Sequence, residues 1–209
     1  MEEKKSIVDI LMNIPGEPPM QIHRRILREF LPVLLLIHIL NIVLMAFTVL
    51  IPTWEGFGII LAAASVGCYF ALSTANSRYR RAGIFQALYL LCLILSTPLN
   101  NMGLLMLTSA LLKLIAGFQE YYAHAEMLDR TDGGLAHSWR MLFYWSLGTL
   151  LVAMISTLFL STLMLMFDWS NTVVFWVVTA VTYLPELLVE ILYLRNICLM
   201  IRHTKKREE

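Results

Sequence analysis

The sequence predicts an all-α protein that is integral to a membrane, with six transmembrane helices in one bundle and both termini in the cytoplasm. Three observations lead to this prediction: six long apolar runs, the position of the Lys and Arg residues, and the overall composition. Apolar residues make up 58% of the 209-residue chain, and its mean hydropathy is +0.69. A soluble protein of this size seldom contains so many long, uniformly apolar segments.

Each apolar run is long enough to cross a membrane. A helix needs about 20 mostly apolar residues to cross a hydrocarbon core about 30 Å thick. The predicted spans are residues 30–51, 57–75, 83–99, 103–119, 141–167 and 173–198. They form a six-helix transmembrane domain over residues 30–200, between a cytoplasmic N-terminal segment (1–29) and a charged cytoplasmic tail (201–209).

The positive charges set the orientation. Of the 16 Lys and Arg residues, all but Lys113 lie in the N-terminal segment, near the links after the second and fourth spans, or towards the C-terminus. The links after the first, third and fifth spans hold none. Because Lys and Arg are enriched in short cytoplasmic loops, both termini are predicted to be cytoplasmic. We therefore expect an integral protein of a bacterial plasma membrane, surrounded by the lipid bilayer.

The segments between the spans are short. Residues 5–14 have apolar residues at helical spacing, which fits either an amphipathic helix on the inner membrane surface or a disordered tail. The fourth span is predicted to continue as a helix to Leu128 and to end before Gly133. Trp139 and Trp145 are predicted to lie at the inner membrane interface, where amphipathic rings are enriched.

The second span has one face made only of small residues. We call it the small-residue face; it consists of Ala63, Gly67, Ala71 and Ala75. In lipid, small residues let two helices approach closely. The face therefore predicts helix packing, either within this bundle, which we favour, or against another membrane protein or a second copy of this chain.

Several ionisable or polar residues lie inside the predicted spans. We call them the path residues; they are His38, Asn41, Lys113, Glu186 and Glu190. Each charge near the membrane centre costs about 2.5–3.5 kcal/mol on insertion scales, so these side chains should face the bundle interior. The simplest arrangement pairs Lys113 with Glu186. One carboxylate is then left without a cation, and it is either protonated or reaches Arg195 or the aqueous edge.

Two roles are open for the path residues. Ionisable groups inside a membrane commonly mark solute, ion or proton pathways. Pro185 precedes Glu186 and leaves the carbonyl of Val181 without its helical donor, which resembles the broken helices of carriers. The alternative is a structural lock, in which a salt bridge fixes the register of the helices.

Motifs for other chemistry are missing from the sequence. Glu120 and His124 are one helical turn apart and could share a metal, but a solvated helix extension is favoured and no metal site is predicted. The sequence has no Walker A, GxGxxG or GxSxG motif, so we assign no cofactor and no catalytic residue. Nothing in it predicts nucleic-acid binding.

In size and number of spans, the chain is similar to the substrate-binding membrane subunits of energy-coupling-factor vitamin transporters. The small-residue stripe of that family lies in its first span, whereas here it lies in the second, and residues 30–38 contain no alanine ladder. The resemblance covers no motif, so no residue role is carried over from it.

Two hypotheses about function follow from these patterns. The first is a small membrane carrier, or the membrane subunit of a transporter, for a small solute or ion that passes the path residues. The second is a non-catalytic partner, regulator or assembly protein that binds another membrane protein through the small-residue face. An intramembrane enzyme ranks third.

Overall fold

The structure is a computed structural model that describes residues 23–50, 55–96, 103–167 and 171–205. Within these ranges the chain forms six α-helices and no strand, which confirms the all-α prediction. The helices are α3 (Arg24–Leu50), α4 (Glu55–Leu72), α5 (Ser77–Ser96), α6 (Gly103–Leu128), α7 (Gly133–Phe167) and α8 (Asn171–Lys205). The expected amphipathic segment at residues 5–14 lies outside the described residues.

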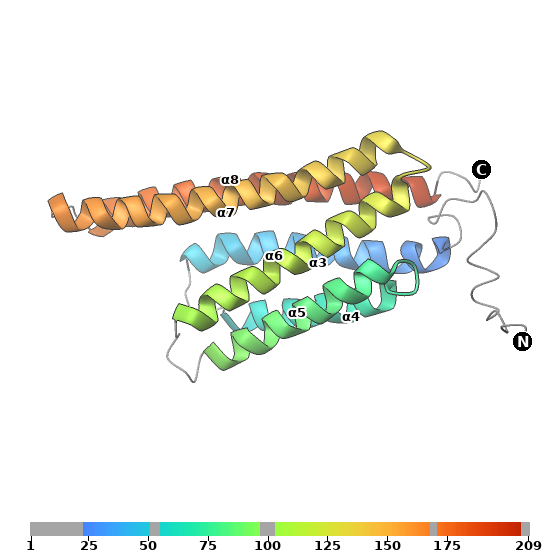
Figure 1. The fold of residues 1–209 in the computed structure, drawn as a ribbon, viewed down its shortest axis with the longest axis horizontal. Helices are drawn as coiled ribbons and strands as arrows, with labels where there is room; N and C mark the ends of the chain where they lie inside the picture. Colours follow the sequence, from blue (N-terminus) through green and yellow to red (C-terminus); the bar gives the residue numbers. More distant parts are fainter. Residues whose placement is uncertain (1–22, 51–54, 97–102, 168–170, 206–209) are drawn as a thin grey trace, which may run out of the picture.

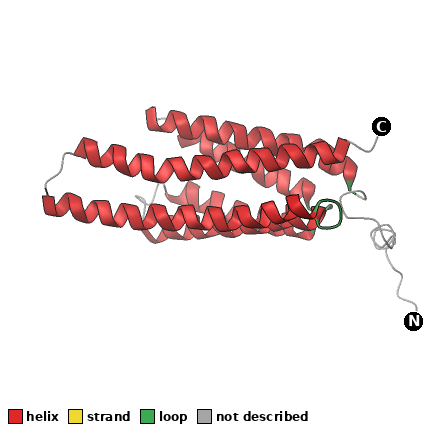
Figure 2. Cartoon of the chain, turned by 90° about the horizontal axis from the view of Figure 1, so that it is seen from above, coloured by secondary structure: helices red, strands yellow, loops and turns green. Residues whose placement is uncertain are grey.

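The helices form a closed ring in chain order. Each packs against the next, and α8 returns to pack against α3. The helices lie roughly along one axis in both views (Figures 1 and 2). The start of α3 and the end of α8 lie at one end of the bundle, together with the α4–α5 and α6–α7 turns (Figure 1). We call this the terminal end and the opposite one the distal end.

Two side-chain caps set the turns at the terminal end. The Asn76 side-chain oxygen accepts a hydrogen bond from the backbone N–H of Arg78 at 2.8 Å, before α5. The Asp132 carboxylate accepts one from the backbone N–H of Leu135 at 2.9 Å, at the start of α7. Such caps satisfy amide groups that the first turn of a helix leaves without partners. The helix end at Leu128, predicted from the sequence, is confirmed.

Most of the buried side chains that the structure describes lie in the terminal half of the bundle. Among the described residues, the buried apolar side chains come from the part of each helix nearer the terminal end, such as Leu27 to Ile37 in α3 and Val189 to Met200 in α8. Trp139 is one of them. Its ring is 0% exposed and packs against buried side chains of α6 and α8, so it is a core residue of the bundle and does not face lipid.

Two described segments are long and apolar enough to cross a membrane: Arg24–Leu44 and Gly133–Ser156. Only 22% and 11% of their most apolar stretches are buried inside the structure, whereas a core helix of a soluble protein would be mostly buried. Large apolar side chains such as Leu158 and Leu188 also point outward. These observations support association with a membrane. They cover two of the six predicted spans; Phe57–Leu72 is a further apolar helix, but a shorter one.

The small-residue face is offset from the side of α4 that packs inside the bundle. Ala62, Ser65, Tyr69 and Leu72 of this helix are buried, whereas Ala63 and Gly67 are exposed. The favoured expectation, burial within this bundle, is therefore wrong for these two residues. Of the four residues of this face, Ala75 is buried as expected, although it lies just beyond the end of the helix. Ala71 is half-buried.

Candidate functional site

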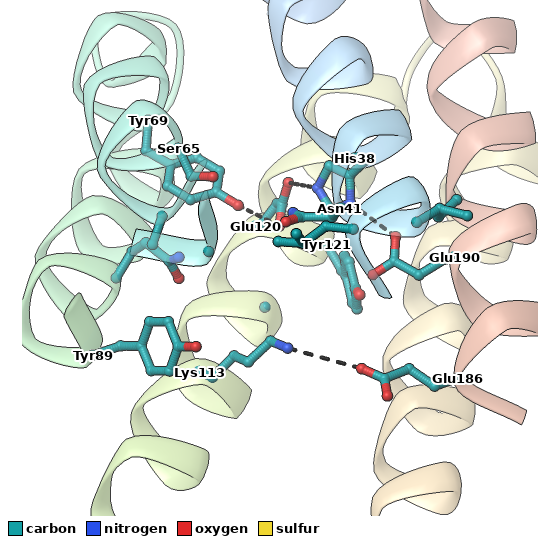
Figure 3. Close-up of a pocket in the computed structure, with 16 residues that line it drawn as sticks. His38, Asn41, Ser65, Tyr69, Tyr89, Lys113, Glu120, Tyr121, Glu186 and Glu190 are labelled. Carbon is teal, nitrogen blue, oxygen red and sulfur yellow. Dashed lines mark hydrogen bonds and ion pairs between the residues drawn. The ribbon is translucent and has the colours of Figure 1, made fainter. Parts of the chain in front are cut away.

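The structure contains a cavity of about 320 Å³ with many polar lining residues, contributed by five helices (Figure 3). All five path residues line it, from α3, α6 and α8. The other polar lining residues are Ser65, Tyr69, Gln86, Tyr89, Glu120 and Tyr121. The chain therefore brings together residues up to 152 positions apart, and it places them around one space.

The end of the cavity nearest the distal half holds a loose ion pair. Lys113 Nζ lies 3.9 Å from Glu186 Oε1, as the sequence predicts, and the two residues face each other across the cavity (Figure 3). Their side chains are 62% and 41% exposed, so this part of the cavity opens to the surface of the bundle. A charge-assisted hydrogen bond is about 2.7–2.9 Å long, so this pair is in contact only through its charges.

The remaining path carboxylate pairs with histidine. His38 Nδ1 lies 2.9 Å from Glu190 Oε2, and the ring of His38 stacks on that of Tyr193 with centroids 3.7 Å apart. The sequence left two alternatives for this carboxylate, no cationic partner or a contact with Arg195 or the aqueous edge. The structure shows a different one, in which Glu190 contacts His38. Here α3 supplies the partner, because its His38 lies at the depth of Glu190 where α3 packs against α8.

Glu120 has more polar contacts than any other described residue of the site (Figure 3). Tyr69 donates a hydrogen bond to its Oε2 at 2.7 Å, and Tyr193 donates one to its Oε1 at 2.5 Å. The same Oε1 lies 3.9 Å from His38 Nε2 and 3.6 Å from His124 Nε2. Two phenol donors and two imidazoles around one carboxylate suit its acceptor-only chemistry.

The expectation that Glu120 and His124 lie on a solvated helix extension is wrong. Glu120 is 3% exposed and His124 is 0% exposed. They follow the predicted fourth span, but the ring of helices stays closed there, and α4, α5 and α8 each present a tyrosine to them. The sequence did hold a signal for this, since Tyr69 and Tyr193 occupy the same faces as other inward residues of α4 and α8.

His124 extends the network towards the terminal end. Its Nδ1 lies 2.6 Å from the hydroxyl of Tyr79, and its ring packs against Trp139 with centroids 4.3 Å apart. Both His124 and Tyr79 lie outside the predicted spans. Burial lowers the pKa of the His124 imidazole and raises the pKa of the Tyr79 phenol well above its usual value. A neutral His124 can accept from Tyr79 at Nδ1 and turn its Nε2–H towards Glu120.

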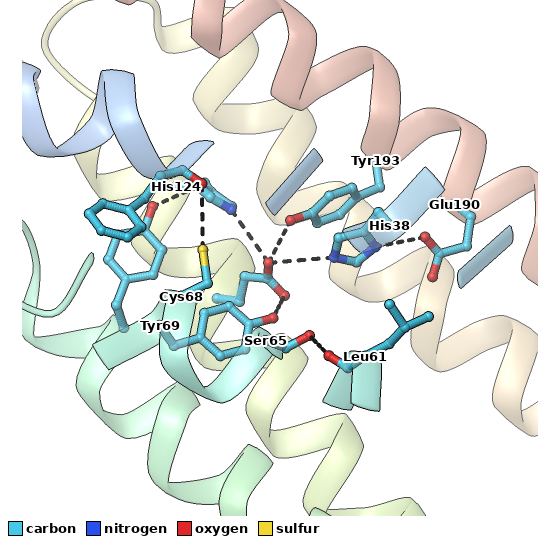
Figure 4. A network of polar contacts seen from close by, with 11 residues as sticks. His38, Leu61, Ser65, Cys68, Tyr69, His124, Glu190 and Tyr193 are labelled. Atoms are coloured by element: carbon cyan, nitrogen blue, oxygen red, sulfur yellow. Dashed lines mark hydrogen bonds and ion pairs between the residues drawn. The ribbon is translucent and has the colours of Figure 1, made fainter. Parts of the chain in front are cut away.

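These contacts form a series of exchangeable groups, joined by two hydrogen bonds and by two longer carboxylate–imidazole contacts. It runs from Glu190 to His38, Glu120, His124 and Tyr79, with the separations given above, and it links α8, α3, α6 and α5. Figure 4 shows the contact between His38 and Glu190 and the positions of His124 and Tyr193 beside it. Chains of carboxylates and imidazoles are a recurring arrangement in membrane proteins that move protons or ions. Within the described part of the chain, no group of three or more His, Cys, Asp or Glu residues is arranged to hold a metal ion.

Comparisons of the chain with protein-family models, with curated proteins and with solved structures found no match.

Proposed function

We propose that this protein is a small membrane carrier, or the membrane subunit of a transporter, whose solute or ion passes through the polar cavity. The observation that carries the proposal is the placement of the five path residues around one cavity of about 320 Å³ that opens at Lys113. A salt bridge that served only as a lock needs no such space around it. The loose Lys113–Glu186 pair also fixes register poorly, because its two charges do not share a hydrogen bond.

The proposal includes the full topology expected from the sequence: six spans in a bacterial plasma membrane, with the terminal end in the cytoplasm. In that orientation the cavity opens towards the outer half of the bundle. The packed terminal half, with Trp139, His124 and Tyr79 in it, closes the cytoplasmic side. Carriers alternate between two such states around a site near the bilayer midplane, and the present arrangement corresponds to the outward-open one.

Loss of the cavity charges should abolish transport while the fold survives. We expect liposomes containing the purified protein to take up at least one member of a panel of radiolabelled cations, anions and neutral solutes. Lys113→Ala and Glu186→Gln should each reduce that uptake by about tenfold or more, because a carrier must both bind its solute and release it again, and a change of 1.4 kcal/mol in either step already amounts to tenfold. Their side chains are partly exposed, so neither change should unfold the bundle.

Glu126→Gln is the matched control for this experiment. Glu126 is a partly exposed carboxylate that pairs with Arg78 and does not line the cavity. Its neutralisation should leave uptake unchanged. Equal uptake by the wild-type, Lys113→Ala and Glu186→Gln proteins, with all three folded, would contradict the carrier proposal.

A second candidate function rests on the exposed part of the small-residue face. A Cβ atom added at Gly67 would meet no atom within 4 Å, so this side of α4 has room for a neighbouring helix. In lipid such a helix would be held by close backbone packing. We propose this face as the contact surface for a membrane-protein partner or a second copy of the chain, should the carrier proposal fail.

Gly67 and Gly83 provide a paired test of this alternative. At Gly83, an added Cβ would lie 3.3 Å from Tyr69 Cβ and 3.4 Å from the ring of Phe70. Gly83→Leu should therefore destabilise the α4–α5 packing by about 1–3 kcal/mol, as overpacking usually does. Gly67→Leu should leave the thermal stability of the monomer unchanged and abolish crosslinking to a partner in native membranes. Persistent crosslinking of the Gly67→Leu protein would count against a partner at this face.

A further inference from the structure

We infer that the cavity binds a small organic cation, a primary amine or a quaternary ammonium, held between carboxylates and tyrosine rings. The inference deepens the proposed function by naming the class of solute, and its role in transport rests on that function. Binding itself can be measured without transport. Three features of the lining lead to this class: its charge balance, its aromatic residues and the position of Lys113.

The charge balance of the lining favours a cation. Three carboxylates line the cavity, those of Glu120, Glu186 and Glu190, against two basic groups, Lys113 and His38. With both basic groups charged, one negative charge remains; with His38 neutral, two remain. The unbalanced negative charge attracts a cation to the cavity. An anionic solute would instead meet three carboxylates and a single lysine.

The aromatic lining favours an organic cation over a metal ion. Tyr69, Tyr89 and Tyr121 all line the cavity. Tyrosine rings attract ammonium groups through the negative face of the ring, and aromatic cages of this kind recognise quaternary ammonium ligands. The volume of about 320 Å³ lies at the small end of the range found for small-molecule sites.

Lys113 already presents an ammonium group to this site. Its side chain lies beside Tyr89 and points towards Glu186 across the cavity (Figure 3). At 3.9 Å, the Lys113–Glu186 pair leaves the carboxylate able to accept a closer donor. A soluble amine can therefore take the position between Glu186 and Tyr89 and compete with Lys113 for this carboxylate.

Calorimetry on the full-length protein in lipid nanodiscs tests the class of ligand directly. The probes are choline, propylammonium, propionate and 3,3-dimethylbutan-1-ol, which has the shape of choline without its charge. We expect binding of choline or propylammonium, at least tenfold weaker binding of the neutral alcohol, and no binding of propionate. Equal binding of the alcohol and choline, preferential binding of propionate, or no binding of any probe by folded protein would each overturn the inference.

Variants of Lys113 and Glu186 give opposite expectations for a cation. Glu186→Gln should weaken binding of the cationic probe by about tenfold or more. Lys113→Gln should strengthen it several-fold, because it removes both a repulsive charge and a competitor for Glu186. A site for anions would respond in the reverse sense. Weaker cation binding by Lys113→Gln, together with unchanged binding by Glu186→Gln, would therefore refute the inference.

Two substitutions of Tyr89 distinguish attraction of the cation by the aromatic ring from hydrogen bonding by the hydroxyl. Tyr89→Phe should retain the affinity for the cationic probe within about threefold, whereas Tyr89→Leu should lose it, since only Phe keeps the ring. The same affinity in Tyr89→Leu as in Tyr89→Phe would remove the aromatic part of the argument. Circular dichroism and gel filtration of each variant show whether it is folded.

The two proposals fail in different ways. Binding of choline or propylammonium without uptake into liposomes would overturn the carrier proposal and leave the cation site standing. If the protein instead takes up an anionic or neutral solute, Lys113→Ala blocks that uptake and no cation binds, the cation site is overturned and the carrier proposal stands.

Discussion

Replacing Trp139 with alanine should lower the free energy of unfolding by about 3–5 kcal/mol, the usual cost of removing a large aromatic ring from a core. Trp139 is fully buried near the start of α7. Its ring contacts those of His124, with centroids 4.3 Å apart, and Tyr193, at 5.1 Å. The resulting cavity would lie between α6, α7 and α8. Equilibrium unfolding of the purified protein in mixed detergent micelles measures the change.

Trp145 is the matched control, six residues further along the same helix. Its side chain is 57% exposed on the outside of the bundle. Trp145→Ala should change the free energy of unfolding by about 0.5 kcal/mol or less, as most exposed substitutions do. An equal loss in the free energy of unfolding for the two variants would contradict the placement of Trp139 in the core.

This pair also shows what the sequence could not predict. Both tryptophans lie near the terminal end of a long apolar helix, and the enrichment of tryptophan at membrane interfaces applies equally to both. The two residues are six positions apart, which corresponds to about 600° of rotation along the helix at about 100° per residue. Their side chains therefore point to different sides of α7. Which side faces α6 and α8 depends on packing, and the pattern along one helix does not reveal it.

The helices themselves were largely predictable from local chemistry. The apolar runs predicted six helices, and the Thr131–Gly134 segment predicted the end of α6 at Leu128. The depth argument also predicted the Lys113–Glu186 pair, since both residues lie at similar distances from the distal links. Position along a span is a one-dimensional property, so it can be read from the sequence.

The burial of Glu120 at the centre of the site could not be predicted from the sequence, because it depends on which helices pack together. Glu120 follows the predicted fourth span, and on that basis alone it was placed in solvent. Its burial results from Tyr69 and Tyr193, which lie 51 and 73 residues away and reach it from α4 and α8. The sequence places Tyr69 and Tyr193 on inward faces of their helices, but it does not show that these helices lie beside Glu120.

Replacing Glu120 with leucine should destabilise the protein by about 2–6 kcal/mol. The change leaves two buried phenol donors, those of Tyr69 and Tyr193, without an acceptor, and each such group costs about 1–3 kcal/mol. Glu126→Leu is the control. Its carboxylate is 39% exposed and pairs with Arg78, so its loss should cost about 1 kcal/mol or less. Equilibrium unfolding in mixed micelles again provides the measurement.

Adding Tyr69→Phe and Tyr193→Phe to Glu120→Leu should recover most of the lost stability. Replacing both partners of a hydrogen bond with apolar groups can be nearly neutral, whereas replacing one leaves the other unsatisfied. A triple variant no more stable than Glu120→Leu would mean that the hydroxyls are satisfied elsewhere and that the network does not depend on this carboxylate.

The triple variant also tests, for Glu120 and its tyrosine partners, the two roles that the sequence left open for the path residues: a transport pathway or a structural lock. If the polar cluster is only a lock that fixes helix register, a stable apolar replacement should still take up solute. If the cluster belongs to the pathway, the replacement should fold and take up nothing, because the charge that receives the solute or its proton is gone. Restored stability without transport is the outcome we expect, since Glu120 lines the same cavity as Lys113 and Glu186.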